Sequence, residues 1–278
     1  MSGLRRLAKN TCLPRRGHAR NRRAKDQEVE NRKERSAKQN NPKRTRRTRE
    51  RLSEDSGCFW IKFEGEKRLA TENLAVGIQA YKEKLVTYKK REYRIWDPYR
   101  SKLASAILNG VPVHSICYGA SVLYLGASTG TTVSHVSDMV GSGGAVFAVE
   151  HTSRVARELM ERVARHRPNV TPILQDARRP SEYFSVFGRM DVVYCDIAQP
   201  DQTEISINNC KKYLKPGGTL FLVIKARSIN VAKNPGDIFR SEISKLQDFD
   251  VLHNVDLRPY HKDHAMVLGR YCHHETNL

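Results

Sequence analysis

The chain has 278 residues and carries 49 Lys and Arg against 30 Asp and Glu, a formal net charge of +19 at pH 7. This length accommodates one domain of ordinary size plus an extension. No apolar run reaches the roughly 18 residues of a membrane span and no secretory h-region is present, so we expect no membrane association. The six cysteines are scattered without a C-x-x-C pair. That pattern argues against a zinc site or a disulfide framework, and it fits a reducing compartment.

Most of the positive charge lies in an N-terminal arm, because residues 1–51 hold 19 Lys and Arg against 5 Asp and Glu. The arm, which we bound at 1–55, has few large apolar side chains and no sustained periodicity, so we expect it to be disordered. Its densest run, Pro42–Arg51, is typical of a nucleic-acid patch or a nuclear import signal, with a merely solvated tail as the alternative. The acid-free first 25 residues also admit a mitochondrial transit peptide, although they lack its Ser content.

The next segment, residues 56–95, consists of short apolar or β-rich pieces separated by charged turns, and it predicts a small β-rich subdomain. A domain of different character follows over residues 96–278. It opens with the stretch Trp96–Leu108, in which Leu103, Ile107 and Leu108 share one helical face. Pro98 stands where a helix tolerates proline, so we predict a helix that begins near Trp96.

Strands and helices alternate from residue 121 onward. The pattern predicts strands over 121–126, 145–150, 171–175, 191–196 and 219–224, with helices over 131–140, 153–166, about 180–187 and 203–214. A final β-rich pair covers 250–257 and 264–271. This alternation predicts an α/β fold with a parallel, doubly wound, Rossmann-like sheet that binds ligands at the carboxyl ends of its strands. The final pair adds an antiparallel edge.

A small-residue loop ends the first of these strands, in the stretch Val122–Thr132. Gly126 lets the backbone approach a ligand closely, and the helix that follows offers free N–H groups to a negative group. The G-x-x-x-G spacing differs from the G-x-G-x-x-G of nicotinamide sites and suits a carboxylate and an amine, which favours S-adenosylmethionine. A Gly-rich turn of another α/β protein is the alternative. Glu150 ends the second strand, where a carboxylate holds ribose hydroxyls.

Suitable side chains follow every predicted parallel strand, in the order Thr131 and Thr132, Glu150, Asp176 and Ala177, Asp196 to Gln199, and Lys225. Each is weak by itself, because polar residues after strands usually just begin loops. Lys225 emerges directly from a buried apolar run, where a lysine serves as a base, orients a hydroxyl or extends to solvent. His264 stands at the edge of the last strand, where an isolated histidine is more often structural.

At the level of whole segments, the chain resembles the fibrillarin family of S-adenosylmethionine-dependent RNA ribose 2′-O-methyltransferases. The matching segments occur in order across about residues 66–271 and are Glu92–Ala104, Val122–Asp138, Asp196–Gln202 and Lys262–Gly269. The resemblance implies the sheet of a class I methyltransferase. It places a catalytic set on Lys102, Asp196, Lys225 and His264. It places cofactor contacts on Thr131, Thr132, Glu150, His151, Asp176, Ala177, Asp196 and Gln199, beside the loop glycine Gly126; it implies no metal.

The chain departs from the family pattern in three places. His151 stands where Phe is usual, so adenine stacking is weaker or different, and Asp97 stands where Asn is usual. Eukaryotic members carry a Gly/Arg-rich N-terminal region, whereas this arm is rich in Lys and Arg with hardly any Gly. Archaeal members are usually shorter and lack such an arm, so the arm suggests a divergent eukaryote.

The resemblance also implies partners and a location. The expected assembly is a box C/D ribonucleoprotein with a guide RNA that selects nucleotides in pre-rRNA, a Nop-domain scaffold protein and a kink-turn-binding protein. The expected location is the nucleus and nucleolus, with the mitochondrion as a minor alternative. Two alternative functions remain: methylation of a protein such as a histone glutamine, and a non-catalytic structural role in the same particle.

Overall fold

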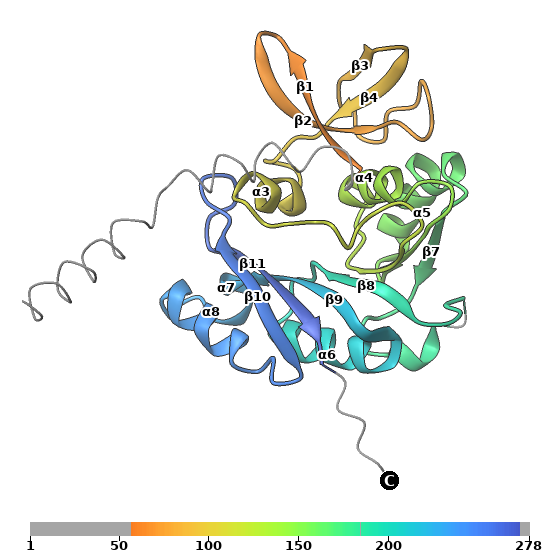
Figure 1. Cartoon of the computed structure of the whole chain (residues 1–278). Coiled ribbons are helices and arrows are strands. Elements are labelled where there is room, and N and C mark those ends of the chain that lie inside the picture. Colours follow the sequence, from red (N-terminus) through yellow and green to blue (C-terminus); the bar gives the residue numbers. More distant parts are fainter. Residues whose placement is uncertain (1–56, 184, 273–278) are drawn as a thin grey trace, which may run out of the picture. The chain divides into compact units, whose positions relative to one another are not determined.

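The computed structural model describes residues 57–183 and 185–272, which belong to one compact unit. The predicted basic arm, residues 1–55, lies outside the described residues. Figure 1 shows two sheets, a small one built from the first strands and a large one flanked by helices. A search of the described residues finds no helix that is long and apolar enough to span a membrane.

The small sheet is antiparallel and has the strand order β1-β2-β4-β3. Its strands are β1 (Cys58–Phe63), β2 (Glu66–Glu72), β3 (Leu85–Tyr88) and β4 (Arg91–Ile95). Two-residue turns close both hairpins, and both central residues have positive φ in each: 50° and 82° at Glu64 and Gly65, and 48° and 67° at Lys89 and Lys90. Such turns match the twist of the strands that they join. The expected β-rich structure ahead of the large sheet is therefore confirmed.

The large sheet has seven strands in the order β10-β11-β9-β8-β5-β6-β7. Five of them are parallel: β5 (Ser121–Leu125), β6 (Ala145–Glu150), β7 (Val170–Leu174), β8 (Met190–Cys195) and β9 (Leu214–Lys225). The strands β10 (Phe249–Asp256) and β11 (His264–Tyr271) add the antiparallel edge. The predicted doubly wound sheet, of class I methyltransferase type, is confirmed.

Helices cover both faces of this sheet. On one face lie α3 (Lys102–Leu108), α4 (Thr131–Val140) and α5 (Ser153–Arg162), and on the other lie α6 (Gln202–Tyr213), α7 (Ala226–Ile229) and α8 (Pro235–Ile243) (Figure 1). Short 3₁₀ helices occur at η1 (Ala164–His166) and η2 (Pro180–Glu182). The two core layers follow from this arrangement, because successive side chains of a strand point to opposite faces.

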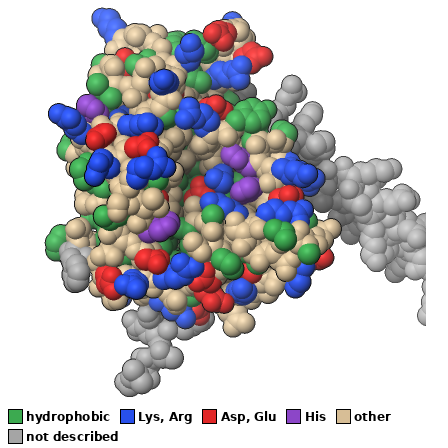
Figure 2. Space-filling model, turned by 180° about the vertical axis from the view of Figure 1, so that it is seen from behind, with side chains coloured by type: hydrophobic (Ala, Val, Ile, Leu, Met, Phe, Trp, Pro, Cys, Tyr) green, Lys and Arg blue, Asp and Glu red, His purple; other side chains and the backbone are tan. Residues whose placement is uncertain are grey.

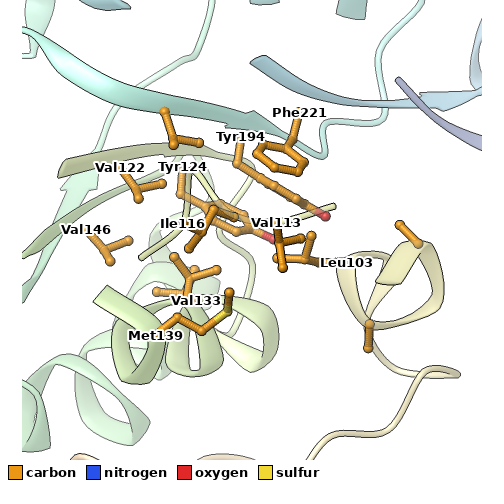
Figure 3. Close-up of a cluster of buried hydrophobic side chains, with 14 of the residues drawn as sticks. Leu103, Val113, Ile116, Val122, Tyr124, Val133, Met139, Val146, Tyr194 and Phe221 are labelled. Carbon is orange, nitrogen blue, oxygen red and sulfur yellow. The ribbon is translucent and has the colours of Figure 1, made fainter. Parts of the chain in front are cut away.

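Strand β5 shows the alternation most clearly. Val122 and Tyr124 pack in the core layer under α3 and α4, together with Leu103 and Val133 (Figure 3). Leu123 and Leu125 pack in the opposite layer. All of the β5 side chains after Ser121 are therefore buried, as expected for a central strand that is covered on both faces. The strand ends then meet at one edge, which carries the predicted site.

Three predicted helices are wrong in extent. The helix expected over 153–166 ends at Arg162 as α5, and the separate turn η1 follows it. The helix expected from Trp96 begins only at Lys102, because Ser101 is its N-cap and accepts a hydrogen bond from the Ala104 amide. Trp96 is instead a fully buried core residue. Of the helix expected over 180–187, the described residues form only the 3₁₀ turn η2. The Pro180 carbonyl, which the first turn of an α-helix would use, accepts the Tyr213 hydroxyl at 2.6 Å. Helices α7 and α8 were not predicted.

A buried ionic network joins the small sheet to α4. The Arg94 guanidinium donates to Glu83 Oε1 at 2.6 Å and to Asp138 Oδ2 at 2.7 Å, and Arg167 donates to the other Asp138 oxygen at 3.3 Å. Two cations thus balance two carboxylates. His135 lies beside them, with its ring nitrogens 2.8 Å from the Thr71 hydroxyl and 2.7 Å from the Tyr81 hydroxyl. Burial lowers the pKa of His135 well below 6.5, and the nearby arginines add to this effect.

Candidate functional site

A cavity of about 220 Å³ lies at the carboxyl ends of β5, β6, β7 and β8. Its lining includes most of the predicted cofactor residues, namely Gly126, Glu150, His151, Asp176, Ala177, Asp196 and Gln199. Lys225, the last residue of β9, also lines it. The parallel strands bring these residues together although they are far apart in sequence, as the fold predicts.

Gly126 allows two strand ends to meet at this cavity. Its φ is +79°, and a Cβ atom added there would lie 2.7 Å from the carbonyl oxygen of Asp196. The Asp196 amide in turn donates to the Leu125 carbonyl at 3.0 Å. Only glycine lets the loop after β5 pass so close to the end of β8. The residue therefore sets the floor of the cavity next to the Asp196 carboxylate.

Glu150 presents a fixed carboxylate to the cavity. It is 7% exposed, and its two oxygens accept hydrogen bonds from the Ser128 amide at 3.0 Å and the Thr152 amide at 2.9 Å. These bonds hold the side chain in place and leave further lone pairs for hydroxyl donors. His151 is exposed at the rim, with Nδ1 3.4 Å from Glu150 Oε1.

Arg178 is a lining residue that the sequence analysis did not identify. Its guanidinium donates to Gln199 Oε1 at 2.8 Å and binds Asp201 in a two-pronged ion pair with both N–O distances at 3.0 Å. It thereby fastens the loop after β7 to the loop after β8. No pattern in the sequence distinguishes it from the neighbouring Arg179, since only the fold shows which arginine faces the cavity.

Asp196 lies between two lysine side chains. Lys102 Nζ is 3.1 Å from one carboxylate oxygen, and Lys225 Nζ is 2.7 Å from the other. Lys225 Nζ also donates to the Asp196 carbonyl at 2.9 Å. The three side chains are only 11–21% exposed, so the charges interact at lower effective dielectric than in water. Each lysine acts here as a hydrogen-bond donor to Asp196.

Gln202, at the start of α6, fixes the backbone at this point. It is fully buried, accepts the Lys225 amide hydrogen at 2.9 Å and donates to the Gln199 carbonyl at 2.8 Å. One side chain thus joins the end of β9 to the loop after β8. The sequence analysis counted it within a matching segment without assigning it a role.

His264 joins the same group through strand pairing. It is the residue opposite Lys225 in the β9–β11 register. Its Nδ1 lies 2.6 Å from the Lys262 carbonyl, which only accepts, so Nδ1 carries the hydrogen and Nε2 of the neutral ring has a free lone pair. Burial lowers the pKa of His264 below 6.5, and Lys102 and Lys225 add to this effect. Figure 2 shows a hollowed face where basic, acidic and histidine side chains gather.

Thr131 and Thr132 do not line the cavity. They are the first residues of α4. The Thr132 hydroxyl is 3.0 Å from the hydroxyl of Ser101, the cap of α3. In this geometry Thr132 supports the helix that carries Lys102. Among the described residues, no group of three or more His, Cys, Asp or Glu is placed to hold a metal ion.

A family model named Fibrillarin matches residues 50–273. The chain belongs to the fibrillarin family. A fibrillarin-like rRNA/tRNA 2′-O-methyltransferase of Saccharolobus islandicus is 50% identical over 210 residues, which cover 75% of this chain and 90% of the relative. Membership in this family agrees with the segments on which the resemblance was based.

Two solved structures extend the comparison. Aeropyrum pernix fibrillarin, in complex with natively bound S-adenosyl-L-methionine, matches with a TM-score of 0.71 and 41% identity, covering 77% of this chain and 94% of that one. A fibrillarin from a fibrillarin/Nop5p complex matches with a TM-score of 0.68 and 34% identity, covering 78% and 98%. The two relatives named here by organism, from Saccharolobus islandicus and Aeropyrum pernix, are archaeal.

Proposed function

We propose that the protein is an S-adenosylmethionine-dependent RNA ribose 2′-O-methyltransferase that acts in a box C/D guide ribonucleoprotein on pre-rRNA. The observation that carries this proposal is the Asp196 carboxylate held between Lys102 and Lys225 at the border of the cavity. The proposal is supported by the two cations and the carboxylate that this arrangement holds beside the cavity assigned to the cofactor. The relatives named above support the reaction class.

The cavity fits the cofactor. Gly126 lets the end of β5 approach the Asp196 backbone at the cavity, and Glu150 offers a carboxylate to ribose hydroxyls. Asp176, Ala177 and Gln199 line the end assigned to the adenine, where His151 stands in place of the usual Phe and makes stacking weaker or different. Bound there, S-adenosylmethionine supplies an electrophilic methyl group.

The residues around Asp196 would prepare the attacking oxygen. An RNA 2′-hydroxyl that reaches Asp196 meets the Nζ atoms of Lys102 and Lys225, which stabilise negative charge as it develops on the oxygen. Both lysines donate hydrogen bonds to Asp196 in this geometry. Neutral His264 retains a lone pair on Nε2, and we assign it the role of proton acceptor. The 2′-oxygen then forms its bond to the methyl carbon as the carbon–sulfur bond breaks.

Partners and location are further parts of the proposal. A Nop-domain scaffold is supported by the relative solved in complex with Nop5p. A guide RNA, its rRNA target and a kink-turn-binding protein follow from the resemblance. Nucleolar location depends on the basic run Pro42–Arg51, outside the described residues. Imaging of the tagged full chain tests it, and exclusion from the nucleus would contradict it.

Substitution at Lys225 tests the reaction itself. We expect Lys225→Ala to lower methyl transfer by about 10²–10⁴-fold, the usual contribution of a positioned acid–base or charge-stabilising group. Cofactor affinity, measured by calorimetry, should stay close to that of the wild type, because Lys225 is not among the residues to which we assign cofactor contacts. Wild-type transfer by the variant in a reconstituted particle would refute the assignment. Lys211→Ala, on the exposed face of α6, is the control.

A further inference from the structure

Helix α3, which carries Lys102, is bonded at both ends to the hairpin of β10 and β11. Residues 257–263, which we call the β10–β11 loop, lie beside this helix (Figure 1). Ahead of the helix, His261 Nε2 lies 2.9 Å from the Pro98 carbonyl oxygen. At the other end, the C-cap Asn109 donates from Nδ2 to two carbonyls where β10 passes into the loop, at 2.8 and 3.1 Å. The loop therefore holds α3 from both sides.

These contacts decide the placement of α3 because the helix is short. It has seven residues, too few for a helix to be stable in water without tertiary contacts. The hydroxyl of its N-cap Ser101 adds a contact to the Thr132 hydroxyl at 3.0 Å. Lys102 is the first residue of the helix and follows Pro98 closely in the chain. The position of the Lys102 ammonium beside Asp196 therefore depends on where the Pro98 carbonyl is fixed.

The same loop fixes the backbone next to other members of the candidate catalytic set. Its last residue, Asp263, accepts the Ala226 amide hydrogen through its carbonyl at 3.1 Å, and its carboxylate accepts an arginine of α7 at 3.0 Å. Ala226 directly follows Lys225. At the start of the loop, the Leu257 amide donates to the His264 carbonyl at 2.9 Å. One loop is thus bonded to three segments that each carry a member of that set.

The His261 ring supplies this hydrogen bond without adding charge to the site. A carbonyl oxygen only accepts, so Nε2 carries the hydrogen and the neutral ring keeps its lone pair on Nδ1. Burial lowers the pKa of His261 below 6.5, and the Lys102 ammonium adds to this effect. The ring is therefore neutral at pH 7. Its centroid lies 5.9 Å from that of the His264 ring, so the two histidines occupy the same border of the site.

We propose that His261 is a positioning residue for methyl transfer, because its bond to the Pro98 carbonyl sets the placement of Lys102 against Asp196. It acts through α3 and does not touch the reacting atoms. The proposal rests on the proposed methyltransferase function. It gives a role to a residue that lies outside the four segments on which the resemblance was based.

Amine labelling of the full-length protein tests the placement of Lys102 without an enzymatic readout. A limiting amount of acetic anhydride modifies the lysines, and mass spectrometry reads the extent at each one. Lys102 of the wild type should react slowly, since its side chain is 21% exposed and paired with Asp196. His261→Leu removes the donor and should raise this labelling about 5-fold, the factor in an equilibrium constant that loss of one ordinary hydrogen bond produces. Lys211, exposed on α6, is the internal reference.

Methyl-transfer rates at saturating cofactor and RNA connect this placement with catalysis. His261→Leu should lower the rate about 10- to 100-fold, since displacement of a reacting group by about 1 Å can lower rates about 10²-fold. Cofactor affinity should stay close to that of the wild type. His261→Gln keeps a side-chain N–H donor for the Pro98 carbonyl, so it should restore both slow labelling of Lys102 and a rate close to that of the wild type.

A second variant and a control complete the set. Asn109→Leu removes the bonds at the other end of α3 and should also raise the labelling of Lys102, which keeps the test decisive if His261→Leu does not fold. His253→Leu changes an exposed histidine on β10 of the same hairpin and should leave labelling and rate unchanged.

The outcomes separate this inference from the proposed function. Unchanged labelling of Lys102 in both His261→Leu and Asn109→Leu overturns the inference. Equal losses of rate in the Leu and Gln variants of His261 also overturn it, because the ring then acts by a route other than the donor bond. A parallel fall of rate, cofactor affinity and melting temperature in His261→Leu indicates a general structural role and overturns it as well. The expected labelling without methyl transfer to RNA by the wild type supports the placement of Lys102 and overturns the proposed function instead.

Discussion

Gly126→Ala tests how closely the strand ends must approach for the site to work. The new Cβ atom would lie 2.7 Å from the Asp196 carbonyl oxygen and 3.0 Å from its carbon, and the residue would keep a φ of +79°. An ordinary contact begins at 3.4 Å, so the Asp196 backbone must move by about 0.7 Å. That carbonyl also accepts the Lys225 ammonium at 2.9 Å, so the displacement reaches the catalytic group.

Two effects of Gly126→Ala should lower the free energy of unfolding. A non-glycine residue in the left-handed region costs about 1–2 kcal/mol. The backbone clash adds about 1–3 kcal/mol of overpacking. Since misplacement of reacting groups by about 1 Å can lower rates about 10²-fold, we expect methyl transfer to fall about 10- to 100-fold. Thermal unfolding and a labelled-methyl assay measure the two effects.

Gly217→Ala is the matched control for this variant. Gly217 has a φ of +74°, but a Cβ atom there meets nothing within 4 Å. The control therefore carries the conformational cost without the clash, and its melting temperature should fall less than that of Gly126→Ala. Equal melting temperatures for the two variants, or wild-type methyl transfer by Gly126→Ala, would refute the claim that the Asp196 backbone leaves no room for a Cβ atom at residue 126.

Further predictions concern titration, the buried network and the arm. As the pH is lowered, the methyl-transfer rate should fall with an apparent pKa below 6.5, because His264 becomes protonated. This loss of rate at low pH should be absent in His264→Gln, and its persistence in that variant would contradict the assigned role. The pKa of His135 is lowered in the folded protein, so the neutral ring stabilises the fold fully above pH 6.5. Below that pH the free energy of unfolding should fall by up to about 1.4 kcal/mol per pH unit. Urea unfolding of His135→Phe should lack this dependence, and an unchanged profile would exclude His135 as its source. Arg94→Met should cost about 3–5 kcal/mol in urea unfolding because Glu83 loses its partner, and a loss below 1 kcal/mol would contradict the network. Deletion of residues 1–51 should weaken RNA binding without lowering the melting temperature. The slope of log affinity against log salt concentration should become shallower by about 0.7 for each lost single-strand phosphate contact, and an unchanged slope would indicate that the arm serves import or binds a protein partner.

The sequence predicted the parts of the fold that hydrophobic periodicity controls. Helix 131–140 and strand 145–150 have the predicted bounds, because a buried strand and an amphipathic helix each leave a clear pattern of apolar residues in the sequence. The predicted start of the helix at 96–108 was too early. Proline is tolerated in a first helical turn, which suggested a start near Pro98, but the N-cap of the helix is Ser101. Helix α8 was missed although Asn234 and Pro235 form a cap and first turn, since its apolar face is short.

The candidate site shows the same division. Residues that directly follow parallel strands, such as Glu150, Asp196 and Lys225, meet as predicted because strand ends share one edge. The orientation of α4 is set by packing, so Thr132 faces Ser101 and not the cavity, which sequence position does not reveal. Arg178 was missed for the same reason, since its role depends on two loops that meet only in space. The assigned roles of these residues remain predictions.

Methyl transfer to RNA tests the central proposal most directly. Full-length protein is incubated with S-adenosylmethionine labelled in the methyl group, a Nop-domain partner, a guide RNA and a complementary target, beside a parallel reaction with histone. The proposed function predicts label in the target RNA, at a position that resists alkaline cleavage because its 2′-oxygen is methylated. Label in histone alone would favour the protein methyltransferase. Cofactor binding without transfer to either substrate would contradict an enzymatic role. It would favour the alternative in which the protein is a non-catalytic structural subunit of the particle.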